Sequence, residues 1–248
     1  MKHKILEYDL ATSSNDIAKD LAQNGAEHGT TVIVHSQTNG RGRSGRAFIS
    51  NSENGLYMSI ILRPTLPPQA YNTLTALACV AVVNAIEKTT SSAPKIKWVN
   101  DIYINDRKIC GILTESQISQ GTFEYIICGI GVNITPPKNG FDAEISNIAG
   151  AIFEKNAPID YKMALCNIIL DELFTYYDKI EEKAHMPKYK EYSMIIGKEV
   201  DVYQGNKVIN GVAYDIGDNA ELIVKCNDGT IRTFSSGEAR VRRAGEIL

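Results

Sequence analysis

Residues 95–134, KIKWVNDIYINDRKICGILTESQISQGTFEYIICGIGVNI, decide the fold class of this chain. They contain strand-like runs at residues 95–98, 101–104, 108–115 and 123–134. Turn residues such as Asn105 and Asp106 separate the runs, and turns this short join antiparallel neighbours. The stretch therefore predicts a hairpin-rich sheet and not a series of βαβ units.

The segments on either side add strands and helices. Further strand-like runs cover residues 5–10, 31–36 and 55–62, and helical periodicity covers residues 13–22, 67–88 and 160–183. The helix at 67–88 is apolar on more than one face, as a helix packed deep against a sheet would be. We predict an α+β fold in which a mixed β-sheet packs with helices.

The pattern changes near residue 192. Beyond it, about five short strand-like runs are separated by tight Gly, Asn and Asp turns. This spacing favours a small SH3-like β-barrel over an open sheet. We predict two domains, residues 1–192 and 193–248.

Composition excludes several classes of protein. The 248 residues carry 26 Lys and Arg against 29 Asp and Glu, so no overall positive field would hold the chain on nucleic acid or anionic lipid. The longest apolar run, residues 76–83, is shorter than the roughly 18 to 20 residues of a membrane span, and the N-terminus has no signal-peptide pattern. We expect a cytoplasmic protein without a membrane segment.

Cysteines and histidines lack metal-binding spacing. The five cysteines lie far apart in apolar segments without a CxxC pair, which predicts buried free thiols, and the four histidines form no HxH or HExxH pair. We expect no metal ligands from the protein itself.

Residues 40–46, GRGRSGR, hold three of the nine arginines between three glycines. Glycine lets backbone N–H groups approach an anion, and guanidinium groups suit phosphate and carboxylate oxygens, so the segment predicts an anion-binding loop. An RNA-binding patch is the alternative, which the acidic charge balance and the flanking strands disfavour.

Lys108 is a candidate for a fixed cation beside a carboxylate. If residues 105–106 form a two-residue hairpin loop, Tyr103 pairs with Lys108. Asp101 then pairs with Cys110, and Asp101 and Lys108 become diagonal neighbours on one face. Such a lysine would stabilise developing negative charge, whereas the alternative is an ordinary solvated ion pair. A three-residue loop would place the two side chains on opposite faces.

Two further motifs are weaker by themselves. Gly129 and Gly131 suggest the close approach of another backbone or a ligand, with Asn133 as a donor and acceptor. The run TSSN at 12–15 has the composition of a helix N-cap, which is its simplest interpretation.

Taken in order, motifs over nearly the whole chain resemble one family, the biotin protein ligases. The matching segments are TSSN at 12–15, Gln37, GRGRSGR at 40–46, NGLYMSI at 54–60, KWVND at 97–101, RKICGILTE at 107–115, GIGVN at 129–133 and SGEARVR at 236–242. The resemblance implies a class II synthetase-like mixed sheet with helices on one face, followed by an SH3-like barrel. Ser14, Phe48 and Val99 depart from the threonine, tryptophan and proline common in the family.

The resemblance implies a two-step ligase reaction. Biotin and ATP give biotinyl-5′-AMP and pyrophosphate, and a lysine ε-amine of a biotin carboxyl-carrier protein or domain then attacks the mixed anhydride. Mg²⁺ would arrive with ATP, near Asp101. A lipoyl ligase of the same fold and a non-catalytic biotin-binding protein are the alternatives.

The resemblance also implies roles for individual residues. Catalytic roles fall to Lys108, Arg43 and Asp101. Biotin binding falls to Ser13, Ser14, Asn15, Gln37, Gly40, Arg41, Gly42, Arg43, Lys108 and Gly111. ATP binding falls to Arg43, Arg46, Phe48, Asn100, Lys108 and Asn133.

The position of the TSSN motif bears on partners. Repressor-type members of the family have a winged helix-turn-helix before this motif, which begins here at residue 12. We therefore expect a monofunctional ligase that binds no specific DNA sequence. Exposed sheet edges allow either a homodimer or docking of the carrier by strand addition.

Overall fold

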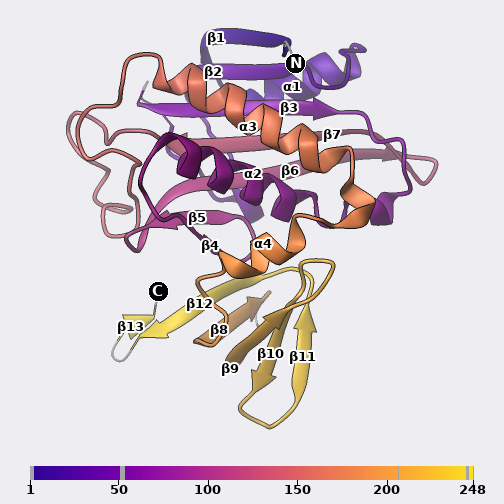
Figure 1. Ribbon diagram of the computed structural model, residues 1–248, viewed down its shortest axis with the longest axis vertical. Helices are drawn as coiled ribbons and strands as arrows, with labels where there is room; N and C mark the ends of the chain where they lie inside the picture. The colour runs from indigo at the N-terminus through magenta and orange to yellow at the C-terminus, as the bar shows by residue number, and fades with distance from the viewer. Residues whose placement is uncertain (1–2, 51–53, 206, 244–245, 248) are drawn as a thin grey trace.

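The structure is a computed structural model that describes residues 3–50, 54–205, 207–243 and 246–247. A larger sheet carries the helices, and the C-terminal strands form a smaller sheet beside it (Figure 1). In the described residues the larger sheet contains β1 (Ile5–Ala11), β2 (Thr31–Gln37), β3 (Gly55–Leu62), β4 (Lys95–Lys97), β5 (Asp101–Ile104), β6 (Arg107–Ser119) and β7 (Thr122–Asn133).

The strand order of the larger sheet is β1-β2-β3-β7-β6-β5-β4. β1 and β2 run parallel, and the other neighbours run antiparallel. The predicted mixed sheet is confirmed. Strands β4 to β7 form the hairpin-rich half of the sheet, which the short turns in residues 95–134 predict.

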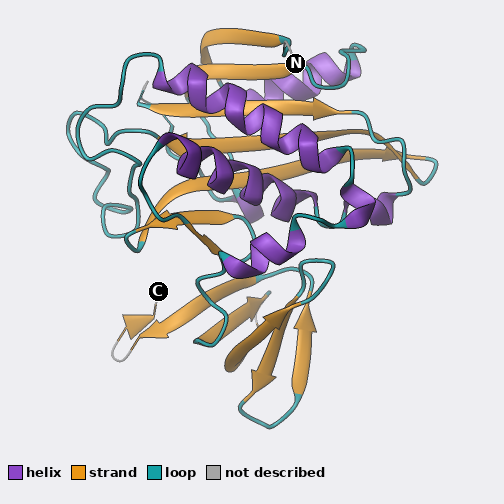
Figure 2. Ribbon diagram, in the orientation of Figure 1, coloured by secondary structure: helices purple, strands orange, loops and turns teal. Residues whose placement is uncertain are grey.

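Helices cover both faces of this sheet. The helices are α1 (Ser14–Gln23), α2 (Leu74–Thr89), α3 (Tyr161–Tyr177) and α4 (Met186–Glu191), with 3₁₀ turns at Arg43–Gly45, Pro68–Tyr71 and Ile180–Glu182. α2 and α3 pack on the face that presents Ile33 and Met58, whereas α1 packs on the face that presents Val32 and Ile61 (Figure 2). The expectation of helices on one face alone is wrong, because β2 and β3 are apolar on both faces.

α2 is the central helix of the core. Almost every residue from Leu74 to Ile86 is buried, which explains why its apolar positions cover more than one face. By length and composition alone, Pro68–Thr89 passes as a membrane span, but 78% of its apolar window is buried inside the protein. The predicted helix at 67–88 starts as a separate 3₁₀ turn, and the predicted helix at 160–183 ends at Tyr177.

The C-terminal strands form an SH3-like antiparallel sheet. Its described strands are β8 (Glu199–Gln204), β9 (Lys207–Ile216), β10 (Leu222–Cys226), β11 (Ile231–Phe234), β12 (Glu238–Arg243) and β13 (Glu246–Ile247), in the order β11-β10-β9-β8-β12-β13. Val202 and Val224 are buried and continuous with the core of the larger sheet. Trp98 joins the two sheets, since its Nε1 donates a hydrogen bond of 2.8 Å to the Ala220 carbonyl.

The five cysteines are free and buried, as their apolar surroundings predict. Burial raises the pKa of Cys128 and of Cys166 to about 12. These thiols are therefore protonated core side chains near neutral pH.

Candidate active site

A cavity of about 610 Å³ lies on the α1 face of the larger sheet and reaches the second sheet. It collects most of the residues that the sequence singles out: Ser13, Ser14, Asn15, Gln37, Arg41, Gly42, Arg43, Arg46, Phe48, Asn100, Asp101, Lys108 and Gly111. Gly40 and Asn133 do not line it. Segments more than one hundred residues apart thus form one candidate site.

Strand β7 forms the floor of the cavity, and its successive residues point to opposite faces of the sheet. Cys128 and Ile130 point into the core on the α2 side, so Gly129 and Gly131 face the other way. A Cβ at Gly129 would lie 2.2 Å from Asn15 Oδ1, and a Cβ at Gly131 would lie 2.7 Å from the Phe48 ring. The sequence suggests another backbone or a ligand above these glycines, whereas the groups that approach them in the structure are these two side chains.

Buried polar side chains form one end of the cavity. Ser13, Ser14, Asn15 and Gln37 are each no more than 6% exposed. The Ser14 amide donates to Gln37 Oε1 at 2.6 Å, and Asn15 Oδ1 lies 2.6 Å from Ser59 Oγ. Hydrogen bonds within the protein therefore fix these donors and acceptors in place before any ligand binds.

The β5–β6 hairpin brings Lys108 to Asp101. Asn105 and Asp106 have φ values of 50° and 60°, as a two-residue turn between antiparallel strands requires. Tyr103 pairs with Lys108, as predicted, and Lys108 Nζ lies 2.7 Å from Asp101 Oδ1. Both side chains are about one quarter exposed, at 28% and 23%.

The predicted pairing of Asp101 with Cys110 is wrong. Asp101 pairs with Gly111, because the register shifts after the pairing of Tyr103 with Lys108. The extra residue of this β-bulge puts Lys108 and Gly111 on the same face, and it leaves Cys110 buried in the core. Besides its pairing with Tyr103, the backbone of Lys108 pairs with the loop after β7, where its N–H donates to the Ile148 carbonyl.

The Gly/Arg segment folds back on itself as a short hairpin. Arg41 and Ala47 form an isolated antiparallel bridge, and the Gly42 amide donates to the Arg46 carbonyl at 2.7 Å. Gly40 lies at the base, where its carbonyl accepts from the Phe48 amide at 2.8 Å. The predicted loop at 37–54 therefore contains this hairpin, and residues 51–53 lie outside the described residues.

Each arginine of this loop contacts a different element. Arg41 pairs with Asp16 on α1 at 2.7 Å. Arg43 donates to Asn100 Oδ1 at 3.3 Å, and Arg46 pairs with Glu238 on β12. The loop is therefore attached to three separate parts of the protein through side chains that line the cavity.

The cavity has an excess of positive charge. Six cationic side chains line it, and the only lining carboxylates among the described residues are Asp101 and Glu238. Burial raises the pKa of Glu238, but hydrogen bonds from Arg46 and Arg240 outweigh burial and hold that pKa below its usual value. Burial lowers the pKa of Lys97. The site suits an anionic ligand such as a carboxylate or a polyphosphate.

Asn133 lies beside a smaller cavity of about 50 Å³. Its Nδ2 donates to the Gly150 carbonyl at 2.9 Å, and Tyr57 lines both cavities. Its role in ATP binding stays a prediction.

The sequence analysis does not assign several of the residues that line the cavity. Lys97 belongs to KWVND, yet only the strand register shows that it faces the cavity. Tyr203 and Arg240 come from the second sheet, with the Arg240 guanidinium 4.5 Å from the centre of the Tyr203 ring. SGEARVR was the only signal for this part of the site.

The site offers little to a metal ion by itself. Within the described ranges, no three His, Cys, Asp or Glu side chains are grouped to hold one. Mg²⁺ is commonly held by one or two carboxylates together with substrate phosphates. Asp101 is a carboxylate that lines the cavity and could serve together with such phosphates.

Comparison with known proteins decides the family. Residues 8–133 match the Biotin/lipoate A/B protein ligase family, and residues 195–242 match the Biotin protein ligase C terminal domain. The chain belongs to the biotin protein ligases. Among curated relatives, the "Bifunctional ligase/repressor BirA" of Bacillus subtilis is 35% identical over 95% of this chain and 74% of its own length.

Other members of the biotin protein ligase family agree with this placement. A "Biotin--[acetyl-CoA-carboxylase] ligase" of Mycobacterium tuberculosis is 26% identical over 94% of this chain and 88% of its own length. The solved structure "Biotin protein ligase from Aquifex aeolicus in complex with biotin and ATP" superposes with a TM-score of 0.79 at 24% identity, covering 97% of this chain and 99% of that one. The superposition establishes the shared fold over both sheets.

Proposed function

We propose that this chain activates biotin with ATP to biotinyl-5′-AMP and transfers the biotinyl group to one lysine of a biotin carboxyl-carrier protein or domain. The observation that carries the proposal is the Lys108–Asp101 pair at 2.7 Å, set between a buried polar pocket and an arginine-rich loop. The names of the relatives in Bacillus subtilis and Mycobacterium tuberculosis support the same chemistry.

The buried polar end suits the ureido ring of biotin. A ureido group has both donors and an acceptor, and it binds best where the partner groups are already fixed and dry. Ser13, Ser14, Asn15 and Gln37 offer such groups at 3–6% exposure. We assign them to biotin recognition.

Lys108 and the loop arginines suit the reacting centre. A biotin carboxylate oxygen attacks the α-phosphorus of ATP and pyrophosphate leaves, so negative charge moves from the carboxylate to the leaving group. Lys108 would bind both the carboxylate and the α-phosphate, and Arg43 and Arg46 would bind the phosphates. Asp101 orients the Lys108 ammonium group, with which it is paired.

The second step needs the anhydride to be protected. The carrier lysine amine attacks the acyl carbon of biotinyl-5′-AMP, AMP leaves with the bonding electrons, and the amine loses a proton. Until the carrier binds, water must stay away from the anhydride. The hairpin at residues 40–48, with Gly42 and Phe48 on the cavity, is placed to exclude it. Mg²⁺, when bound with ATP, supplies charge neutralisation of the phosphates beside Asp101.

Exchange of pyrophosphate into ATP tests the first step. The purified chain with ATP and Mg²⁺ is incubated with labelled pyrophosphate and biotin, with lipoate, or with neither acid. We expect label to enter ATP with biotin alone. Exchange with lipoate alone would establish a lipoyl ligase, and no exchange with either acid would contradict the proposal and favour a non-catalytic biotin-binding protein.

Further expectations concern partners and place. We propose that residues 1–192 carry the adenylation chemistry and residues 193–248 complete the nucleotide side of the cavity through Arg240. We also propose a cytoplasmic location and no specific DNA partner.

Light scattering of the free chain distinguishes a monomer from a homodimer. A mobility-shift assay with operator DNA tests the DNA proposal, and we expect no shifted band.

A further inference from the structure

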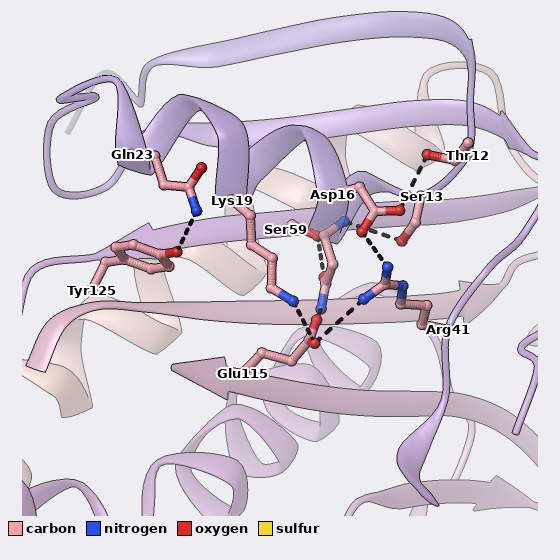
Figure 3. A network of polar contacts seen from close by, with 10 residues as sticks. Thr12, Ser13, Asp16, Lys19, Gln23, Arg41, Ser59, Glu115 and Tyr125 are labelled. Carbon is pink, nitrogen blue, oxygen red and sulfur yellow. Dashed lines mark hydrogen bonds and ion pairs between the residues drawn. The ribbon is translucent and has the colours of Figure 1, made fainter. Parts of the chain in front are cut away.

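Glu115 lies on β6, four residues beyond Gly111 and on the same face of the strand. Its carboxylate accepts hydrogen bonds from Asn15 Nδ2 at 2.7 Å and from Lys19 Nζ at 2.7 Å. Arg41 Nη1 lies 3.6 Å from the same carboxylate, and Figure 3 shows the contacts of Lys19 and Arg41. Three basic or amide side chains from α1 and the Gly/Arg loop therefore converge on one carboxylate of the sheet.

The contact with Asn15 fixes the direction of the amide. Because Nδ2 is bound to Glu115, Oδ1 of the same amide points to Ser59 Oγ, at 2.6 Å. The amide also lies directly over Gly129, where no side chain could fit. Asn15 is thus held in the wall of the cavity by three strands of the sheet, β3, β6 and β7.

The contact with Arg41 joins the loop to the same anchor. Arg41 lies between Asp16 on α1, at 2.7 Å, and Glu115 on β6, at 3.6 Å (Figure 3). Arg41 is 41% exposed, whereas Glu115 is 23% exposed. The loop contact can therefore break and reform in solvent while the contacts of Asn15 and Lys19 stay in place.

We propose that Glu115 is a positioning residue for biotin and for retention of the adenylate: it orients the Asn15 amide in the pocket wall and holds the Gly/Arg loop closed through Arg41. This inference rests on the proposed ligase function. Glu115 itself does not line the cavity, so it acts through Asn15 and Arg41.

The electrostatics agree with a permanent anchor. Burial raises the pKa of Glu115, but hydrogen bonds from Lys19 and Asn15 and the positive charges of Lys19 and Arg41 outweigh it and lower that pKa below its usual value. The carboxylate is therefore ionised at neutral pH, accepts hydrogen bonds from Asn15 and Lys19, and attracts the charge of Arg41.

The chain contains a matched control for this cluster. On the other side of the sheet, Glu172 of α3 accepts Asn84 Nδ2 at 2.5 Å and Lys88 Nζ at 2.5 Å from α2. Asn84 and Lys88 are four residues apart, as are Asn15 and Lys19. Glu172 thus has the same kinds of partner, an asparagine and a lysine, but no loop arginine, and it lies outside the cavity.

The test compares Glu115→Gln with Glu172→Gln in the intact chain. Gln at 115 can still accept from Asn15 but no longer attracts Lys19 and Arg41. We expect the KM for biotin to rise by about tenfold, with the KM for ATP within about twofold of the parent, because one charge-assisted network is lost. Glu172→Gln should leave both constants unchanged.

A second readout isolates the loop. Without a carrier, AMP appears only as fast as biotinyl-5′-AMP escapes or hydrolyses. We expect faster AMP formation in Glu115→Gln and in Arg41→Gln, and non-additive effects in the double variant. Arg41→Gln changes an exposed side chain, so it reports on the loop even where Glu115→Gln folds poorly.

Three outcomes would overturn the inference: an unchanged KM for biotin in Glu115→Gln, equal changes in both KM values, or equal behaviour of the Glu172→Gln control. A parent chain without biotin-dependent exchange would instead remove the proposed function itself.

Discussion

At the scale of single residues, Lys108 lies where the turn at 105–106 and the bulge of β6 bring its ammonium group 2.7 Å from Asp101 Oδ1. Lys108→Met keeps the length of the side chain and removes its charge. We expect biotin-dependent pyrophosphate exchange to fall by about a hundredfold or more. The free energy of unfolding should change by about 1 kcal/mol or less, since the pair is partly exposed.

Lys88→Met is the control for Lys108→Met, because Lys88 forms an ion pair of 2.5 Å with Glu172 away from the cavity. Its exchange rate should match that of the parent. Full activity in Lys108→Met would contradict the catalytic assignment of Lys108.

We propose that Gly129 lies on the biotin side of the cavity and Gly131 on the ATP side, since Asn15 and Phe48 are their respective neighbours. A methyl group at Gly129 would displace Asn15, and a methyl group at Gly131 would displace Phe48. We expect Gly129→Ala to raise mainly the KM for biotin and Gly131→Ala to raise mainly the KM for ATP, each with about 1–3 kcal/mol of destabilisation from overpacking. Steady-state kinetics on both variants checks this, and identical changes in both would refute the division of the cavity.

His185 makes the stability of the fold depend on pH. It is fully buried, and burial lowers its pKa to about 4. In the unfolded chain the imidazole takes up a proton near pH 6.5, so the unfolded state binds more protons than the folded state between the two values. We therefore expect the contribution of His185 to the free energy of unfolding to be fully present above about pH 6.5. It should fall as the pH drops towards 4, by up to about 3 kcal/mol.

The variant His185→Gln tests this pH dependence. Urea unfolding at pH 7 and at pH 4.5 should show a smaller difference between the two pH values in the variant than in the parent, even if the variant is less stable at both. An equal difference in the two proteins would show that His185 does not contribute.

At the scale of elements, burial decides what a leucine contributes. Leu77 in α2 is fully buried, whereas Leu10 in β1 is 64% exposed. Leu77→Ala should lower the free energy of unfolding by about 2–5 kcal/mol, since it removes buried methyl groups and leaves a cavity. Leu10→Ala should change it by about 0.5 kcal/mol or less. Urea unfolding of both variants measures the contrast, and similar values would contradict the central role of α2.

At the scale of the whole molecule, the single tryptophan reports on the contact between the sheets. Trp98 is 4% exposed, and its Nε1 donates to Ala220 in the second sheet. In a fragment of residues 1–192 this partner is missing, so we expect red-shifted fluorescence emission and a lower urea midpoint than in the full chain. An unchanged emission maximum would show that the larger sheet buries Trp98 alone.

Sequence reasoning identified the parts of this protein that local patterns determine. Alternation and short turns predicted the strands at 101–104 and 123–134, and tight turns predicted the all-strand C-terminal part, because hydrophobic period and turn chemistry act between neighbours in sequence. The ordered motifs also pointed to the ligase family and to most residues of the cavity. Their individual roles stay predictions.

Tertiary structure decided what depends on partners distant in sequence. The bulge after Lys108, the placement of α1 on the opposite face and the convergence on Glu115 all arise where separate segments meet. Phe48 and Asn15 fill the space above Gly131 and Gly129, which no periodicity reveals. The sequence by itself determined which elements form and which family they belong to, whereas packing determined which side chains face the cavity, because a one-residue shift in register turns every side chain of a strand to the other face.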